Sequence, residues 1–514
     1  MPLCFENIRT PPNHLDTLIE PARDRLIGVV EANRRLLGGY DFLLMDVPVG
    51  EARAMARQAI AGAADAVVVS AGHQPEFIHP GVWAKHVVVR RLADATGAVA
   101  LNLVVDQDAP KTTTVDVAAR YGERVAVIAV PCGNLHLRLP FENQPPAGAD
   151  DCQAFAQRVR EALGDQFGGS LMPRFLDAYC GGSSAVDWVE QSVGARKFAE
   201  AALGITVEDR RVSRFWGGPL MGQVLLDAPR FAGAYNEALA TYRARHRVRA
   251  PNRPVPALSC RDDLCEVPLW AYESGGPRRR LFVRSGADRI ALEVDGDAII
   301  ELDRSATCSW QRLERALDGL QWRVRPRALM LTLWARLLVS DLFVHGIGGA
   351  QYDRITDLII ETYFGVRPPA MACVSATLHP PIADRAIAPD TLPDARRQYR
   401  DIHYNPQRYV ESGYGRLIAE RAAAIARADR LRREQPRDRV ARRQAFLRIR
   451  DANARLAAAV APRIADSEAR IAELERRLRD HQVATRRDYF FALYPETMLH
   501  ALVDRIGDVH DFGG

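Results

Sequence analysis

The segment that begins at Gly72 gathers side chains able to handle a charged substrate. It contains His73, Gln74 and His79 and leads to Lys85. Imidazoles can stabilise developing charge at neutral pH, and a lysine ammonium is a compact partner for phosphate. We assign catalytic roles to His73 and Lys85 and binding roles to Gly72, Gln74 and His79. The structural alternative is that each histidine caps the next helix or bonds a nearby carbonyl, and that the lysine extends to water.

A second polar segment follows an apolar run that ends at residue 105. It contains Asp106, Gln107, Asp108 and Lys111. If the strand persists, the two carboxylates point to the same side, where they could hold Mg²⁺, orient a substrate ammonium or act as a base. We assign catalytic roles to Asp106, Asp108 and Lys111 and a binding role to Gln107. The structural alternative is that the carboxylates cap the next turn.

The scarcity of lysine makes its positions informative. Only three lysines occur among the 69 basic residues, so arginine serves almost wherever charge alone is needed. Lys85 and Lys111 both lie beside the polar segments described above, which favours a role for a compact ammonium group. Lys197 has no such neighbourhood, and we assign it to the solvated surface.

A glycine-rich turn follows the apolar run 342–345. Its glycines permit close approach of the backbone, and free N–H groups at the start of the next helix favour an anion. The spacing lacks the G-x-G-x-x-G dinucleotide pattern, and tight packing explains the glycines equally well. The binding candidates here, which could instead only support the loop, are His345, Gly346, Gly348, Gly349, Tyr352 and Asp353.

The elements that position these loops have an α/β pattern. Short β-branched runs at 65–70, 99–105 and 124–130 alternate with a helical pattern at 82–96. This spacing predicts parallel strands with right-handed crossovers in a doubly wound sheet. We expect residues 61–130 and 326–380 to share one sheet. Ligands of such sheets bind beyond the carboxyl ends of the strands, where the polar loops lie.

The whole chain is predicted to be an α/β protein with a Rossmann-like, doubly wound core, helical and β insertions, and a C-terminal coiled-coil hairpin. Residues 15–19 and 26–30 have helical stripes. The expected parts are N-terminal helices and the first part of the core (1–134), a mainly helical insertion (135–255), a β-meander (256–325), the second part of the core (326–400), a coiled-coil arm (401–488) and a segment that packs on the core (489–514).

Composition indicates an ordinary soluble globular protein. It has 514 residues, 47% of them hydrophobic and 26% charged. The N-terminus lacks a signal-peptide pattern, and the most apolar stretch, 328–344, carries Arg336 and Asp341, so we expect a cytoplasmic protein with no membrane contact. Eight cysteines without a Cys-x-x-Cys pair predict reduced thiols and no metal site.

The C-terminal region is strongly basic. From Arg408 to Asp488 there are 21 Arg against 12 Asp or Glu. No aromatic or glycine interleaving accompanies this charge, so nucleic acid is not favoured as a partner. Ile464, Ile471 and Leu478 recur at heptad spacing and predict a coiled-coil seam. We expect a homodimer through this seam, with an antiparallel hairpin within one chain as the alternative.

Taken in order, these motifs resemble the BshC family, the cysteine ligases assigned to bacillithiol synthesis. The similarity covers most of the chain, although each motif is short. The family's Gly-Gln-Gln loop corresponds to Gly72-His73-Gln74, and its acidic strand end, which includes a histidine, to residues 105–108. Further matches are Trp83, the turn 346–349, the run 365–369 and the run 375–378.

The resemblance implies a carbon–nitrogen ligase that joins cysteine, or a similar amino acid, to an amine-bearing small molecule. It also implies that the Rossmann-like core is of nucleotidyltransferase type and that the coiled coil dimerises, with ATP and Mg²⁺ as candidate cofactors. His73 and Gln107 depart from the family pattern, and the glutamate of its glycine turn is absent, so we expect a sister activity on other substrates. Two alternatives are a nucleotidyltransferase-like enzyme on another small metabolite and a non-catalytic binding or scaffold protein that works through the coiled coil.

Overall fold

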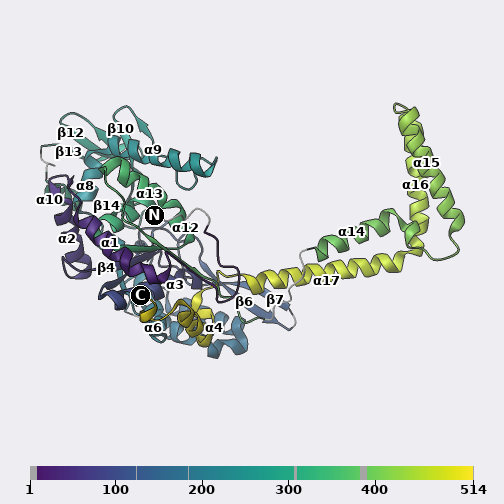
Figure 1. Cartoon of the computed structure of the whole chain (residues 1–514), viewed down its shortest axis with the longest axis horizontal. Coiled ribbons are helices and arrows are strands. Elements are labelled where there is room, and N and C mark those ends of the chain that lie inside the picture. Colours follow the sequence, from purple (N-terminus) through teal and green to yellow (C-terminus); the bar gives the residue numbers. More distant parts are fainter. Residues whose placement is uncertain (1–7, 123, 183, 306–308, 383–389, 513–514) are drawn as a thin grey trace. The chain divides into compact units, whose positions relative to one another are not determined.

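The structure is a computed structural model of the chain and describes residues 8–122, 124–182, 184–305, 309–382 and 390–512 (Figure 1). The chain divides into two compact units. Unit 1 comprises residues 1–120, 127–381 and 486–514, and unit 2 comprises residues 121–126 and 382–485.

Unit 1 contains a six-stranded, mostly parallel sheet. Five strands run parallel, and β1 at one edge is antiparallel to its neighbour. The prediction of an α/β protein with parallel strands from both halves of the chain is therefore confirmed. In spatial order the strands are β1 (Thr17–Glu20), β16 (Ala372–Ala376), β15 (Leu342–His345), β4 (Val68–His73), β5 (Val99–Val104) and β8 (Glu208–Arg211).

Two local predictions about this sheet are wrong, and one of its strands comes from a segment where none was expected. Residues 15–19 were expected in a helix, yet Thr17–Glu20 form β1, because pairing with β16 outweighs the local apolar spacing. Residues 124–130 lie in β7 (Arg124–Pro131), which pairs with β6 (Thr114–Tyr121) in a separate ribbon. The sixth strand, β8, comes from the segment expected to be mainly helical. Its sequence, Glu-Asp-Arg-Arg, is polar because it forms an edge, where charged residues discourage further pairing.

Helices cover the sheet. Helix α3 (Pro80–Thr96) packs across β4, β5 and β16. Val68, Leu101 and Leu103 point from their strands into a large apolar core that also contains residues of segments 218–226, 228–246 and 264–294. The remaining helices of unit 1 are α1 (Leu26–Gly38), α2 (Val49–Ala61), α4 (Ala149–Leu163), α5 (Met172–Gly181), α6 (Trp188–Ala201), α7 (Val212–Phe215), α8 (Gly218–Leu226), α9 (Ala228–His246), α10 (Trp310–Asp318), α11 (Ala328–Trp334), α12 (Ile347–Tyr352), α13 (Arg354–Ile359) and α18 (Glu496–Ile506).

The second sheet of unit 1 is antiparallel and confirms the predicted meander, with three strands more than the pattern showed. Its strands are β9 (Cys260–Arg261), β10 (Leu264–Glu273), β11 (Arg279–Ser285), β12 (Arg289–Val294), β13 (Asp297–Asp303) and β14 (Trp322–Pro326). Cys260 and Cys265 form a disulfide between β9 and β10. The expectation of reduced thiols is therefore wrong for this pair, which antiparallel pairing brings together.

Unit 2 consists mainly of helices. They are α14 (Thr391–Tyr404), α15 (Gly415–Glu434), α16 (Arg439–Ala459) and α17 (Ala461–Thr485). Helix α15 packs along α16, and α14 packs along α17. Ile471, Leu474 and Leu478 of α17 contact Leu392 and Ala395 of α14. Part of the predicted seam is thus covered within one chain. Across the described ranges, no helix is both long and apolar enough to cross a membrane.

Candidate functional site

The carboxyl ends of β15, β4 and β5 meet at one edge of the parallel sheet, because these strands are adjacent and parallel. The polar loops that follow β4 and β5 touch directly: Gln74 Nε2 donates a hydrogen bond to Asp108 Oδ2 over 2.9 Å. Tyr352 of the glycine-turn helix α12 is close enough to Asp108 to be influenced by its charge. The structure therefore brings the three predicted loops to the same edge.

His73 is the last residue of β4, and His79 lies in the loop between β4 and α3. His79 caps α3, since its Nδ1 accepts a hydrogen bond from Gly81 N over 3.1 Å and Pro80 occupies the first turn. His73 Nδ1 lies 3.0 Å from the carbonyl oxygen of Gln74. Both histidines thus make the local contacts that the structural alternative describes.

The surroundings of these histidines keep them uncharged. Burial, followed by the charges of Lys85 and Lys111, holds the pKa of His73 well below its usual range. Burial, followed by the charge of Arg487, lowers the pKa of His79 to about 4. Both imidazoles are therefore neutral at pH 7 and can accept a proton, but burial and the nearby cations make them weaker bases than free imidazole.

Lys85 lies in the second turn of α3 and is almost fully buried, with 3% of its surface exposed. Its Nζ donates a hydrogen bond over 2.8 Å to the carbonyl oxygen of Gly72, at the end of β4. Burial lowers the pKa of Lys85 to about 8. A lysine that extends to water would be exposed, so that alternative does not describe Lys85. Lys111, in contrast, is exposed.

The two aspartates of the second loop bind different partners. Asp106 is fully buried, and its oxygens accept hydrogen bonds from Arg211 Nε at 2.7 Å and from the Ser213 backbone N at 2.9 Å and Oγ at 2.5 Å. Asp108 accepts from Gln74 and its neighbour Ala109 and forms an ion pair with Arg278. Asp106 therefore joins the β5 loop to the segment after β8.

Gln107, between these aspartates, is buried and donates a hydrogen bond from Nε2 to the carbonyl oxygen of Pro326 at 3.4 Å. Both oxygens of Asp106 and of Asp108 are engaged by protein donors. Within the described ranges, no group of three or more His, Cys, Asp or Glu side chains is placed to hold a metal ion. The predicted Mg²⁺ pair does not fit this arrangement, and we derive no step through a metal.

The glycine turn supports a buried ion-pair cluster. His345 Nε2 lies 3.1 Å from Asp353 Oδ2, which also accepts a hydrogen bond from Arg336 NH1 at 2.7 Å. Burial alone would raise the pKa of Asp353, but His345 and Arg336 hold it well below its usual range. A Cβ on Gly349 would lie 2.7 Å from His345 Nδ1, so this glycine lets α12 pass over the imidazole ring.

The other glycines of the turn have more room. A Cβ on Gly346 or Gly348 would meet nothing within 4 Å. Tyr352, at the end of α12, is partly buried, and burial, followed by the charges of Asp353 and Asp108, raises its pKa. Close packing against the imidazole of His345 therefore explains why residue 349 is a glycine, whereas no packing contact explains the glycines at positions 346 and 348.

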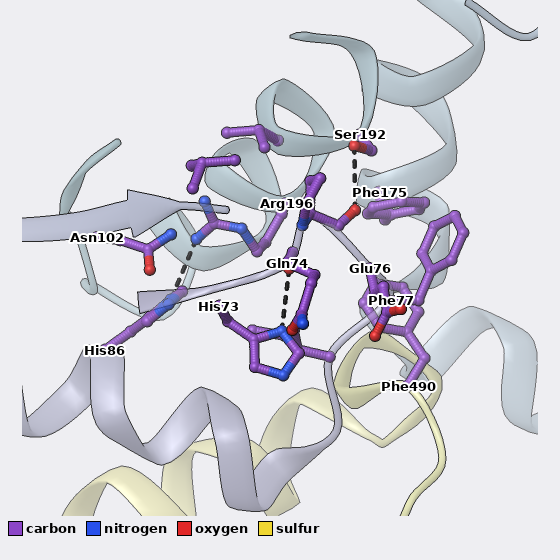
Figure 2. Close-up of a pocket in the computed structure, with 14 residues that line it drawn as sticks. His73, Gln74, Glu76, Phe77, His86, Asn102, Phe175, Ser192, Arg196 and Phe490 are labelled. Atoms are coloured by element: carbon purple, nitrogen blue, oxygen red, sulfur yellow. Dashed lines mark hydrogen bonds between the residues drawn. The ribbon is translucent and has the colours of Figure 1, made fainter. Parts of the chain in front are cut away.

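A small cavity next to His73 is lined partly by residues that the sequence did not single out (Figure 2). About 20 Å³ is open to the centre of a water molecule, which is room for roughly one water. Figure 2 shows His86, Asn102 and Arg196 on one side, Glu76, Phe77 and Phe490 on the other, and His73 and Gln74 between them. His86 lies inside a predicted helix and Arg196 in a distant one, so no local spacing marks them as neighbours.

Glu76 was also missed, although it lies inside the first polar loop. Its Oε1 is buried and has no hydrogen-bond partner among the described residues. Burial raises the pKa of Glu76, and the charge of Lys111 opposes this effect. The sequence offered one signal for Glu76, because this carboxylate lies in a segment with three basic side chains, His73, His79 and Lys85.

No family model matches this chain, and no curated protein matches it either.

Proposed function

We propose that this protein is a carbon–nitrogen ligase that joins the carboxyl group of an amino acid to the amine of a small molecule at the carboxyl edge of the parallel sheet. The observation that carries the proposal is the set of perturbed ionisable groups there. Burial keeps His73 and His79 neutral and lowers the pKa of Lys85 to about 8. Such sets are typical of sites where protons are transferred.

Amide formation needs a base and a positive charge, and this edge supplies both kinds of group. The amine nitrogen attacks the acyl carbon of an activated amino acid, such as an acyl phosphate, and forms the C–N bond. The C–O bond between that carbon and the phosphate breaks, the phosphate leaves with the electron pair, and the neutral imidazole of His73 accepts the proton that the nitrogen loses. The charges of Lys85, Lys111 and Arg487 that act on the histidines favour an anionic acyl substrate.

The resemblance to the BshC family supports the same class of reaction. His73 replaces the first glutamine of the family's loop, and Gln107 replaces its strand-end histidine. Relative to the family pattern, the histidine is therefore in the first polar segment and not in the second. The two segments are in contact through the hydrogen bond between Gln74 and Asp108. A base in a new position on the same edge is consistent with the same bond being formed between different substrates.

Nucleotide is treated as a substrate in this proposal, and no step is assigned to it. The cavity beside His73 has room for roughly one water, far less than a nucleotide occupies. Whether the reaction depends on a nucleotide is therefore tested directly, by comparing reactions that contain ATP and Mg²⁺ with reactions that lack them.

The test is a product search with matched variants. The purified protein is incubated with the twenty amino acids and a panel of amines, including cysteine with glucosaminyl-malate, and amides are identified by mass spectrometry. We expect His73→Asn to lower the rate by about 10²- to 10⁴-fold, the range for a lost general base. We also expect Lys85→Arg to be impaired, because the broad guanidinium does not fit the place of a buried ammonium.

Lys197→Arg is the matched control, because Lys197 is exposed and far in sequence from the loops. It should retain full activity. Product formation at the wild-type rate by folded His73→Asn protein would contradict the proposed base, and the absence of any amide across the panel would contradict the ligase proposal itself.

A further inference from the structure

A groove runs between helices α15 and α16 of unit 2, which lie side by side (Figure 1). Its volume is about 950 Å³, far larger than that of the cavity beside His73. The residues that line it on the α15 side extend from position 420 to position 435, which is about 22 Å along a helix. The groove is therefore long enough to receive about four turns of another helix.

Part of the groove surface is apolar. Ala424 of α15 and Ala452 of α16 line the groove and are buried, whereas Leu447 of α16 lines it and is 44% exposed. Leu431 of α15 adds a second, partly buried leucine. Small alanine side chains let a further helix come close, and exposed leucines are stabilised when another apolar surface covers them. This surface therefore fits the apolar stripe of an amphipathic helix.

Three arginines beside this apolar surface have no acidic partner. Arg427 and Arg430 of α15 and Arg448 of α16 line the groove and are exposed. None of the three forms an ion pair within the described part of the chain. A guanidinium can donate two parallel hydrogen bonds to one carboxylate, so these side chains favour a ligand that carries carboxylates.

The acidic residues of the groove leave this positive charge in place. Glu420 and Asp451 lie 3.6 Å and 3.9 Å from Arg455, the fourth arginine there. Glu434 is the remaining acidic residue of the groove. Over the α15–α16 hairpin, residues 415–459, 13 Arg stand against five Asp or Glu, an excess of eight positive charges. Charge complementarity therefore favours an acidic partner.

Other occupants fit the groove less well. A second copy of the hairpin would bring together two surfaces with the same excess of positive charge. A nucleic acid would cover the leucines with phosphate and sugar, and no aromatic side chain among the described residues lines the groove to stack on a base. A lipid surface is flat and cannot enter a groove between two helices. An acidic helix satisfies both the apolar and the charged parts of this surface.

We propose that the α15–α16 groove is a docking site for an acidic amphipathic helix of another protein. Apolar side chains of the partner at positions i, i+3 or i+4 and i+7 cover Leu431 and Leu447. Carboxylates beside that stripe pair with Arg427, Arg430 and Arg448. Each exposed ion pair contributes little alone, so binding needs the apolar stripe and the charges together. This interaction is separate from the ligase activity proposed above, and neither depends on the other.

The first test uses the full chain and three synthetic peptides. Each peptide has about 21 residues, so that it spans the groove and is long enough to become helical. One has a leucine stripe at helical spacing with glutamate on its other faces, and the second has the same stripe with lysine. The third has the composition of the first, with the leucines out of helical register. We expect fluorescence anisotropy to show that the first peptide binds at least about 10-fold more tightly than the others, and less tightly at higher salt.

The second test compares two charge reversals. Arg448→Glu places a carboxylate in the groove, whereas Arg432→Glu makes the same change at an exposed position outside it. We expect Arg448→Glu to weaken binding of the acidic striped peptide by about 10-fold, because an attractive contact becomes repulsive, and Arg432→Glu to weaken it by less than about 3-fold. Leu447→Gln leaves the charge unchanged and should also weaken binding by about 10-fold, because apolar contact is lost.

The proposal is overturned if the striped acidic peptide does not bind, or binds no better than the peptide without the stripe. Equal effects of the two charge reversals also overturn it, because they indicate general attraction to a basic surface. Tighter binding of a DNA duplex or of phosphatidylserine vesicles than of any peptide assigns the surface to a nucleic acid or a membrane instead. A wild type that is dimeric in light scattering, with a monomeric Arg448→Glu variant, assigns the groove to a second copy of this chain.

Discussion

Lys85 should lose its proton near pH 8 in the folded protein. Its ammonium is buried beneath the β4–α3 loop, with one hydrogen bond to Gly72 O at 2.8 Å. Desolvation lowers the pKa of Lys85 from 10.5 to about 8, and the effect of Cys373 opposes this only in part. The charged form of Lys85 therefore destabilises the folded state, and raising the pH should relieve that penalty.

The size of the effect follows from the two pKa values. Between about pH 8 and 10.5 the unfolded chain keeps a proton on Lys85 that the folded chain has lost, so the free energy of unfolding rises with pH in this window. Integrated from pH 7 to pH 9.5, the gain from this one group is about 2 kcal/mol. Lys85→Met removes the titrating group and keeps most of the apolar stem, so it should lack this gain.

The scarcity of lysine makes a direct assay possible. In protein labelled with ¹³Cε-lysine, the spectrum contains signals from only three side chains, and the signal that disappears in Lys85→Arg belongs to Lys85. We expect that signal to titrate with a midpoint near pH 8. Urea unfolding of wild type and Lys85→Met at pH 7 and 9.5 should show their stability difference change by about 2 kcal/mol. A midpoint above pH 10, or a stability difference that is constant with pH, would refute the reasoning.

Three further predictions concern the packing around the site and in unit 2. Gly349→Ala should lower the free energy of unfolding by about 1–3 kcal/mol, because the added Cβ would lie 2.7 Å from His345 Nδ1. Gly348→Ala is the control: the space around its Cβ is open, so the free energy of unfolding in the same urea titration should change by less than about 1 kcal/mol. Asp106→Asn should destabilise the fold by about 2–3 kcal/mol, because it weakens the hydrogen bonds with Arg211 and Ser213. Asp108 is more exposed, so Asp108→Asn should destabilise the fold by less than about 1 kcal/mol. Similar unfolding midpoints for the two variants would contradict this prediction. Leu474→Asp should reduce helicity measured by circular dichroism, because Leu474 packs on α14, and Ile464→Asp should not; light scattering of the second variant then reports whether the rest of the seam joins two chains.

The sequence predicted the parallel strands well and the edges of the sheet poorly. β4, β5 and β15 are apolar runs that end at turns, and these runs reflect strands buried on both faces. β8 has no such pattern, since Glu208–Arg211 is polar and gains its structure from pairing with β5. β1 has an apolar spacing that fits a helix equally well, and only its partner β16 decides the outcome.

The candidate site shows the same limit. The loops after β4 and β5 were predictable because their polar residues lie within short segments at strand ends. The contact between His86 and Glu200 was not predictable, because these residues are separated by 114 positions and meet only when α3 packs near α6. Likewise, the partner that engages Asp106 is Arg211, which follows by 105 positions. Side-chain partners brought by tertiary packing leave no mark in local spacing.

The order of the sheet has a consequence for how the chain must be made. β4 pairs with β15, so the centre of the sheet joins residues 68–73 to residues 342–345. A ribosome adding about 5–20 residues per second therefore exposes the apolar strands β4 and β5 for tens of seconds before β15 emerges. Closing so long a loop is slow, and unpaired strand edges are prone to aggregate during the wait. Nascent chains that stop before residue 342 should consequently depend on chaperones that shield β4.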